Sequence, residues 1–180
     1  MVSFILSSLS TKSLKAFKLL SKIEASNINY TNYGGESLKS NSGYISYVRV
    51  EYAGGKTKKS NITNGLLLAG VGAKTTINNV MISYSAGNSF SVIGGKVNLD
   101  KMISYKAKNI DYNFDYGTKS NINNALALRS PYVSSDNSKC IRAVSYVSED
   151  VDFSKKGTEV VATNMTLLAD ADDIDYAINS

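Results

Sequence analysis

From residue 44 onward, apolar and polar residues alternate along the chain with a period of two. In YISYVRVEY, this alternation places Val48, Val50 and Tyr52 on one side of an extended chain. Related runs follow as NNVMISYSAG, LDKMISYKAK and CIRAVSYVSED. The spacings are 32, 21 and 41 residues between the aligned positions Val50, Ile82, Ile103 and Val144. Each run is predicted to be a β-strand in one member of a series of repeats.

A second series of short β runs, each closed by glycine, interleaves with the first. Its members are GLLLAGVG, FSVIGGKV and YNFDYGTK, with aligned centres at Leu67, Ile93 and Phe114. Repeats of ~20–30 residues, with two or three short strands and Gly or Asn turns, are typical of a β-solenoid. A β-sandwich also has many short strands, but it does not require the same phrase at matching positions. We therefore predict an all-β fold, a single-stranded right-handed parallel β-helix.

Stacking of the repeats predicts columns of equivalent side chains, because parallel strands lie ~4.8 Å apart and place equivalent residues above one another. The two predicted columns are Tyr52, Tyr84 and Tyr105, and Val50, Ile82 and Ile103. We assign the solenoid to residues 44–170, after an N-terminal segment at 1–43 and before an acidic C-terminal tail at 171–180.

Residues 11–25, TKSLKAFKLLSKIEA, are the one good candidate for a helix. Apolar residues recur near a period of 3.6 at Leu14, Phe17, Leu20 and Ile23. The other face carries four lysines, Lys12, Lys15, Lys18 and Lys22. A basic amphipathic helix can lie on a membrane or contact a partner through such lysines. It can equally cover the open end of a β core, and we favour this capping helix because the helix is short and a large β core follows it.

The composition removes several classes of chemistry. Histidine and tryptophan are absent, and tyrosine is plentiful at 12. Without histidine there is no Ser-His-Asp triad and no His-ligated zinc. The single cysteine, Cys140, lies in the alternating run SKCIRAV and is interpreted as a buried thiol. The glycine pairs match no phosphate-binding motif and are interpreted as turn corners, so no cofactor is predicted.

The net charge of +5 is unevenly distributed. Residues 12–59 hold nine Lys or Arg against three acids, residues 60–148 nine against four, and residues 149–180 two against eight, which gives +6, +5 and −6. The lysines are scattered and only three arginines occur, so no nucleic-acid partner is predicted. No stretch reaches the ~18 apolar residues of a membrane span, and the apolar start lacks a preceding basic residue. We therefore predict no transmembrane segment and identify no convincing signal peptide.

Several of these pieces, in their order and spacing, resemble a family of secreted right-handed parallel β-helix surface proteins of Bacteroidota. The resemblance covers residues 23–131, approximately. It lies in YGGESLKSNSGYISYVRVEYAG, in ITNGLLLAGVGAKTTINNVMISYSAGNSFSVIGGKVNLDKMISYKA and in ALALRSP. Many members are lipid-anchored or are substrates of the type IX secretion system. The resemblance implies a parallel β-helix and a cell-surface location, and it implies no particular chemistry.

The chain departs from this family at its acidic segments. Members usually carry Asp-Asp-Ser-Phe-Glu where this chain has Gly87-Asn88-Ser89-Phe90-Ser91, and a denser Asp run where it has residues 109–115. If those carboxylates bind a cation or ligand in relatives, most of that ligand set is missing here. We also identify neither the family's usual export signal nor an added C-terminal sorting domain in this sequence. We interpret it as a trimmed descendant with a structural use, for example in a phage particle or a surface assembly.

Asp111, Asn113, Asp115 and Tyr116 form the candidate carbohydrate-binding set. Alternation predicts Asp111, Asn113 and Asp115 on one strand face. Four residues of extended strand span about 13 Å, whereas a glycosidase carboxylate pair is ~5–9.5 Å apart. We therefore predict no catalytic pair and interpret the set as a structural ladder that can also line a sugar-binding groove.

The segment LLADADDIDYAINS is the candidate metal site. Its carboxylates are Asp170, Asp172, Asp173 and Asp175. The spacing faintly resembles a calcium loop, but the central Gly and the distal Glu of an EF-hand are missing. An acidic tail is the favoured interpretation, with calcium as the alternative.

Together these observations predict a non-enzymatic structural or adhesive β-helix module of a cell-surface or virion assembly, outside the cell. The alternative is a carbohydrate-binding or polysaccharide-degrading β-helix. The basic N-terminal and acidic C-terminal parts are expected at opposite ends of a linear solenoid, which need covering. We therefore expect a homo-oligomer or a larger assembly, with a glycan as a further possible partner.

Overall fold

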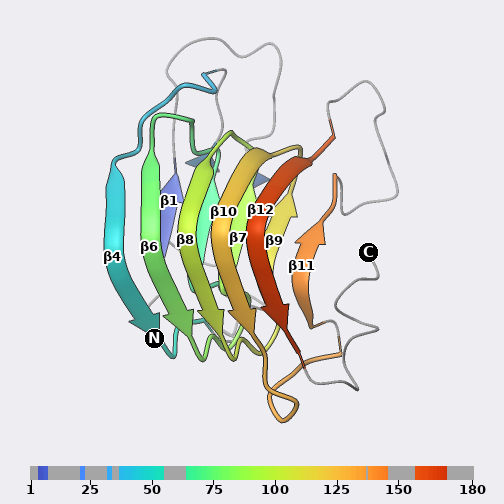
Figure 1. The fold of residues 1–180 in the computed structure, drawn as a ribbon. Helices are drawn as coiled ribbons and strands as arrows, with labels where there is room; N and C mark the ends of the chain where they lie inside the picture. The colour runs from blue at the N-terminus through green and yellow to red at the C-terminus, as the bar shows by residue number, and fades with distance from the viewer. Residues whose placement is uncertain are drawn as a thin grey trace.

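The computed structural model describes residues 4–7, 21–22, 32–33, 37–54, 64–136, 138–145 and 157–169. Within these residues the structure is all β, with two parallel five-stranded sheets that face each other (Figure 1). The short-strand sheet has the order β1 (Phe4–Ser7), β5 (Leu66–Ala69), β7 (Phe90–Ile93), β9 (Ile110–Asp115) and β11 (Lys139–Ala143). The long-strand sheet has the order β4 (Tyr44–Glu51), β6 (Thr76–Ser83), β8 (Asn98–Tyr105), β10 (Lys119–Leu128) and β12 (Glu159–Leu168).

Short and long strands alternate along the chain, and each successive pair stacks on the previous one. We call one short strand and the following long strand a rung, so that β5 and β6 form one rung and β7 and β8 the next. β1 pairs with β5 and β4 pairs with β6, which makes β1 and β4 the first rung. The first sheet therefore takes a strand from the N-terminal segment. This arrangement confirms a parallel β-helix.

Each long strand bends once at a residue other than glycine with positive φ. These residues occupy equivalent places in the five strands, with φ between 51° and 55°: Tyr47, Asn79, Lys101, Asn124 and Asn164. Asn tolerates this left-handed conformation better than other residues with a Cβ, and it occupies three of the five positions. The bend interrupts the alternation, so the buried apolar residues of β6 are Ile77, Val80 and Ile82 rather than every second residue.

The inward residues of the long strands form three columns in the core. The columns are Ile45–Ile77–Leu99–Ile122–Ala162, Val48–Val80–Met102–Ala125–Met165 and Val50–Ile82–Ser104–Ala127–Leu167. The facing sheet contributes Phe90 and Tyr112, whose rings stack with centroids 5.3 Å apart. The Tyr112 hydroxyl donates to the Leu126 carbonyl oxygen at 2.7 Å, which satisfies its polar end inside the core.

The predicted column of Val50, Ile82 and Ile103 is wrong at its last member. Ile82 pairs with Ser104, and Ile103 lies on the outer face with 36% of its surface exposed. The phrase MISY suggested a spacing of 21 residues, whereas the strands pair with a spacing of 22. With a spacing of 21, Lys101 would point into the core at a desolvation cost. The observed register buries Leu99 and Met102 instead.

Two other alignments also differ from the structure. In the short-strand sheet, Val92 pairs with Leu68 and Phe114, so the centres are Leu68, Val92 and Phe114 rather than Leu67, Ile93 and Phe114. Val144 follows β11 and donates its N–H to the Phe114 carbonyl oxygen at 3.0 Å. It therefore belongs to the short-strand series. A shift of one residue moves every side chain of a strand to the opposite face.

The predicted capping helix lies largely outside the described residues. Within residues 11–25, only 21 and 22 are described, and they form the two-residue strand β2 (Ser21–Lys22). β2 pairs antiparallel with β3 (Asn32–Tyr33), so the prediction of a helix is wrong at these two positions. Backbone pairing with a later segment replaces the helical hydrogen bonds there. Elsewhere in 11–25 the helix stays a prediction.

Candidate functional site

Asp111 lies at the start of β9 and forms a buried ion pair with Arg129, the residue that follows β10. Arg129 Nη1 lies 2.6 Å from Asp111 Oδ2, and the exposed fractions of the two side chains are 4% and 0%. Arg129 Nη1 also donates to the carbonyl oxygens of Asn109 at 2.8 Å and Lys139 at 3.2 Å. The guanidinium therefore joins the turn before β9 to the start of β11.

The second carboxylate oxygen of Asp111 accepts a hydrogen bond from the Ser104 hydroxyl, and Ser104 Oγ lies 2.7 Å from Ser89 Oγ. Burial raises the pKa of Asp111, and this effect outweighs the opposing effects of the Arg129 charge and the Ser104 hydrogen bond. Ser104 lies in the inward column in which the neighbouring strand β6 carries Ile82. The register of β8 therefore brings the Ser104 hydroxyl to Asp111.

Asp115 and Asn113 share a different arginine. Arg142 Nη1 donates to Asn113 Oδ1 at 2.9 Å and lies 3.2 Å from Asp115 Oδ2. The other oxygen of Asp115 accepts the Tyr116 backbone N–H at 2.8 Å, while Asn113 donates to Ser91 Oγ at 3.2 Å. Burial raises the pKa of Asp115 above its usual value, despite the hydrogen bond from Tyr116 and the pairing with Arg142.

The structure thus brings Asn113 and Asp115 together and assigns Asp111 to a separate network. Asp111, Asn113 and Asp115 are buried, whereas 36% of the Tyr116 surface is exposed. Of the candidate carbohydrate-binding set, Tyr116 alone offers a large surface to solvent. Sequence reasoning did not identify Arg129 and Arg142 as partners. A usable signal existed, because Asp residues in an otherwise apolar buried strand require a nearby cation.

The rings of Tyr52, Tyr84 and Tyr105 contact one another in sequence, and the predicted stack at equivalent positions is confirmed for Tyr52 and Tyr84 and wrong for Tyr105. The rings of Tyr52 and Tyr84 stack with centroids 5.0 Å apart, and Tyr105 meets Tyr84 edge-on at 5.3 Å. Tyr52, Tyr84 and Lys106 occupy equivalent positions after their long strands, and all three have positive φ. Tyr105 therefore lies one residue before the position that corresponds to Tyr84. This offset accounts for its perpendicular ring. Lys106 Nζ lies 5.1 Å from the Tyr105 centroid, and its hydrogen bond lowers the pKa of Tyr105.

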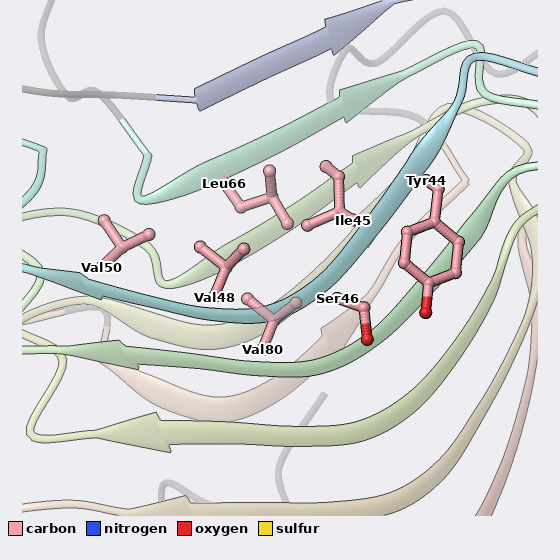
Figure 2. A pocket seen from close by; sticks show the side chains of 7 residues that line it. All are labelled: Tyr44, Ile45, Ser46, Val48, Val50, Leu66 and Val80. Carbon is pink, nitrogen blue, oxygen red and sulfur yellow. The ribbon is translucent and has the colours of Figure 1, made fainter.

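An apolar pocket of about 220 Å³ opens at the first rung. Figure 2 shows Ile45, Val48 and Val50 pointing from β4 into the space beside Leu66, while Tyr44 and Ser46 point away from it. Val80 of β6 completes the lining. None of the described residues that line the pocket is charged, so it suits apolar groups. The pocket lies at the β4 end of the core, where Ile45, Val48 and Val50 are the first residues of the three inward columns.

The remaining predicted site residues cannot be placed. Asp170, Asp172, Asp173 and Asp175 lie outside the described residues, as do Lys12, Lys15 and Lys18. Lys22 lies in β2, and its side chain is not described. In the part of the chain that the structure describes, no group of three acidic or thiol side chains is arranged to hold a metal ion. No described helix has the length and apolar character to cross a membrane.

The stacked rungs, the parallel sheets and the bent long strands define a protein of the parallel β-helix class. The chain belongs to the family of pectate-lyase-like β-helix domains, whose family model matches residues 15–176. No curated protein and no solved structure matches the chain significantly.

Proposed function

We propose that this chain is a non-enzymatic structural or adhesive module built on a β-helix, in an extracellular assembly at a cell or virion surface. The carrying observation is the ion pair between Asp111 and Arg129 at 2.6 Å, with both side chains buried. A general acid or base must lie within hydrogen-bond reach of the substrate. Asp111 is enclosed, and Asp115 has its oxygens engaged by Tyr116 and Arg142. The carboxylates of the candidate set therefore serve the scaffold.

Two further properties support a scaffold. Tyr44 and Tyr47 of β4 are exposed, and within the described residues each five-stranded sheet ends in strands that pair on one side only. The unpaired backbone groups of such edge strands can pair with a strand of another molecule, which favours assembly. We also infer a right-handed winding, because parallel strands joined by crossovers within one sheet are connected right-handed in almost every known case.

Polysaccharide cleavage tests this proposal directly. The purified chain is incubated with a panel of neutral and acidic polysaccharides, with calcium and with a chelator. Reducing ends and the ultraviolet absorbance of unsaturated products are then measured, and Asp115→Asn serves as the matched variant. We expect no product above buffer for either protein. Release that requires Asp115 would overturn the proposal.

Carbohydrate binding is the second candidate function, and two observations favour it. The family model carries the description pectate-lyase-like, which points to polysaccharides. Tyr116, the residue after Asp115, exposes 36% of its surface, and Tyr44 and Tyr132 are exposed as well. A glycan array distinguishes the candidates. Binding that Tyr116→Ala abolishes and Tyr132→Ala preserves would favour a carbohydrate-binding module.

A further inference from the structure

The long-strand sheet ends in two strands that could pair with each other across two molecules. Within the described residues, β4 pairs only with β6 and β12 pairs only with β10. Natural proteins block exposed edges with Pro, Lys or bulges. Neither YISYVRVE in β4 nor EVVATNMTLL in β12 contains Pro or Lys. Among the residues that the structure describes, nothing therefore prevents either edge from adding a strand.

The register of the two strands matches throughout their length. β4 bends at Tyr47 and β12 bends at Asn164, which are equivalent positions with φ of 55° and 51°. The inward residues fall at the same distances from the bend. They are Ile45, Val48 and Val50 in β4 and Ala162, Met165 and Leu167 in β12.

The two ends are also complementary in shape. At the β4 end, Val48 and Val50 line the apolar pocket of about 220 Å³. At the β12 end, Met165 and Leu167 are only partly buried and pack against the core from one side. A strand stacked on β4 in the existing register places Met165 over Val48 and Leu167 over Val50, so the larger side chains of one end meet the pocket of the other.

We propose that a second copy of this chain docks head to tail, with β12 of one molecule pairing in parallel with β4 of the next. The three core columns then continue from molecule to molecule. In the short-strand sheet the same register places the backbone of β11 in one copy beside that of β1 in the next. This inference rests on the proposed structural role and names the partner for it.

Charge favours the head-to-tail arrangement over contacts between identical ends. Among the described residues at the two ends, residues 37–54 carry a net +1 from Lys39, Arg49 and Glu51, and residues 157–169 carry a net −1 from Glu159. Like ends repel each other, whereas opposite ends attract. The two contact surfaces differ, so any assembly of docked copies still has one free β4 end and one free β12 end. Further copies can add at both ends, and the assembly grows as an open filament.

A register-specific cross-link tests the contact without altering the core. Arg49 and Thr166 occupy equivalent outward positions, and both are exposed. In the docked pair their Cα atoms are about 4.8 Å apart, which a disulfide can span. We expect the double variant Arg49→Cys/Thr166→Cys to form a reducible ladder of oligomers on oxidation. In the control Arg49→Cys/Thr163→Cys, the cysteines lie about 10 Å apart along the strand. We expect this control to stay monomeric on the gel.

End-blocked variants test the head-to-tail geometry in solution. Val48→Lys places a charge in the pocket, and Leu167→Lys places one on the opposite end. We expect sedimentation velocity to show concentration-dependent oligomers for the wild type and for the control Tyr132→Lys, which changes an exposed residue outside both edge strands, and monomers for each blocked variant. An equimolar mixture of the two blocked variants is expected to form a dimer that does not elongate, because each supplies one intact end.

Several outcomes would overturn the proposal. These are a wild-type chain that stays monomeric at all accessible concentrations, equal cross-linking in both double-cysteine variants, or no dimer in the mixture. A monomeric chain would overturn the docking proposal but would say nothing about polysaccharide cleavage. Observed cleavage would overturn the proposed non-enzymatic function but would say nothing about the oligomeric state. The two proposals therefore fail separately.

Discussion

Asp111 and Arg129 form an ion pair at 2.6 Å with essentially no solvent contact, and the guanidinium also binds carbonyl oxygens of two other segments. The pair links the turn before β9, the end of β10 and the start of β11. Removing one partner of a buried pair leaves an uncompensated charge and costs about 3–5 kcal/mol. We therefore expect Arg129→Met to reduce the free energy of unfolding by this amount, measured by urea denaturation.

An exposed ion pair provides the control for this measurement. Arg49 and Glu51 lie 2.6 Å apart on the surface, and such pairs contribute about 0–1 kcal/mol. Arg49→Ala should therefore have a small effect. The double variant Arg129→Met/Asp111→Leu should be more stable than Arg129→Met alone, since it removes the orphaned carboxylate. Equal losses for Arg129→Met and Arg49→Ala would contradict the structural role of the pair.

The raised pKa of Asp115 predicts a pH dependence of stability. Because burial raises the folded-state pKa above the unfolded value near 3.9, the folded state binds more protons between these two values. Stability from this group is therefore largest at low pH and declines as pH rises through the folded pKa. In Asp115→Asn the decline between about pH 4 and neutrality should be smaller than in the wild type. Thermal unfolding at a series of pH values measures the difference, and parallel curves would count against it.

The observed register of β8 predicts which of two neighbouring apolar residues matters for stability. Met102 is fully buried, and truncation of such a residue costs about 2–5 kcal/mol. Ile103 lies on the outer face, where substitutions usually change stability by less than about 0.5 kcal/mol. We expect Met102→Ala to be strongly destabilising and Ile103→Thr to be nearly neutral in chemical denaturation. The reverse order would indicate the register suggested by the repeated phrase.

The bend in the long strands predicts a stabilising substitution. Lys101 has φ of 55° at the position where β6 and β10 carry Asn79 and Asn124. Asn adopts this conformation at lower cost than Lys. We expect Lys101→Asn to raise the free energy of unfolding by about 0.5–1 kcal/mol.

Lys108→Asn provides the comparison at an exposed position outside the left-handed region. It should leave the melting temperature nearly unchanged. A decrease in stability for Lys101→Asn would show that the lysine makes a contact that outweighs its backbone strain.

Much of the scaffold was predictable because stacking demands repetition. The alternating run around Val50 predicted a strand, the two interleaved series predicted the two faces of each rung, and the predicted stacking of Tyr52 and Tyr84 was confirmed in their ring contact. Asp111, Asn113 and Asp115 were predicted as a set, but their arginine partners were not. Those partners lie 18 and 27 residues further along the chain for Asp111 and Asp115, and pairing over such distances depends on strand register.

The sequence by itself determined the parallel β-helix, the two interleaved series of strands and the pairing of Tyr52 with Tyr84, because each follows from local periodicity and its recurrence. Only the tertiary structure decided the register. The phrase MISY occurs twice, yet the second copy shifts by one residue, because the whole strand must bury Leu99 and Met102 and keep Lys101 in solvent. That shift places Ser104 in the core beside Asp111. The register is a sum over all side chains of a strand, and no short phrase contains it.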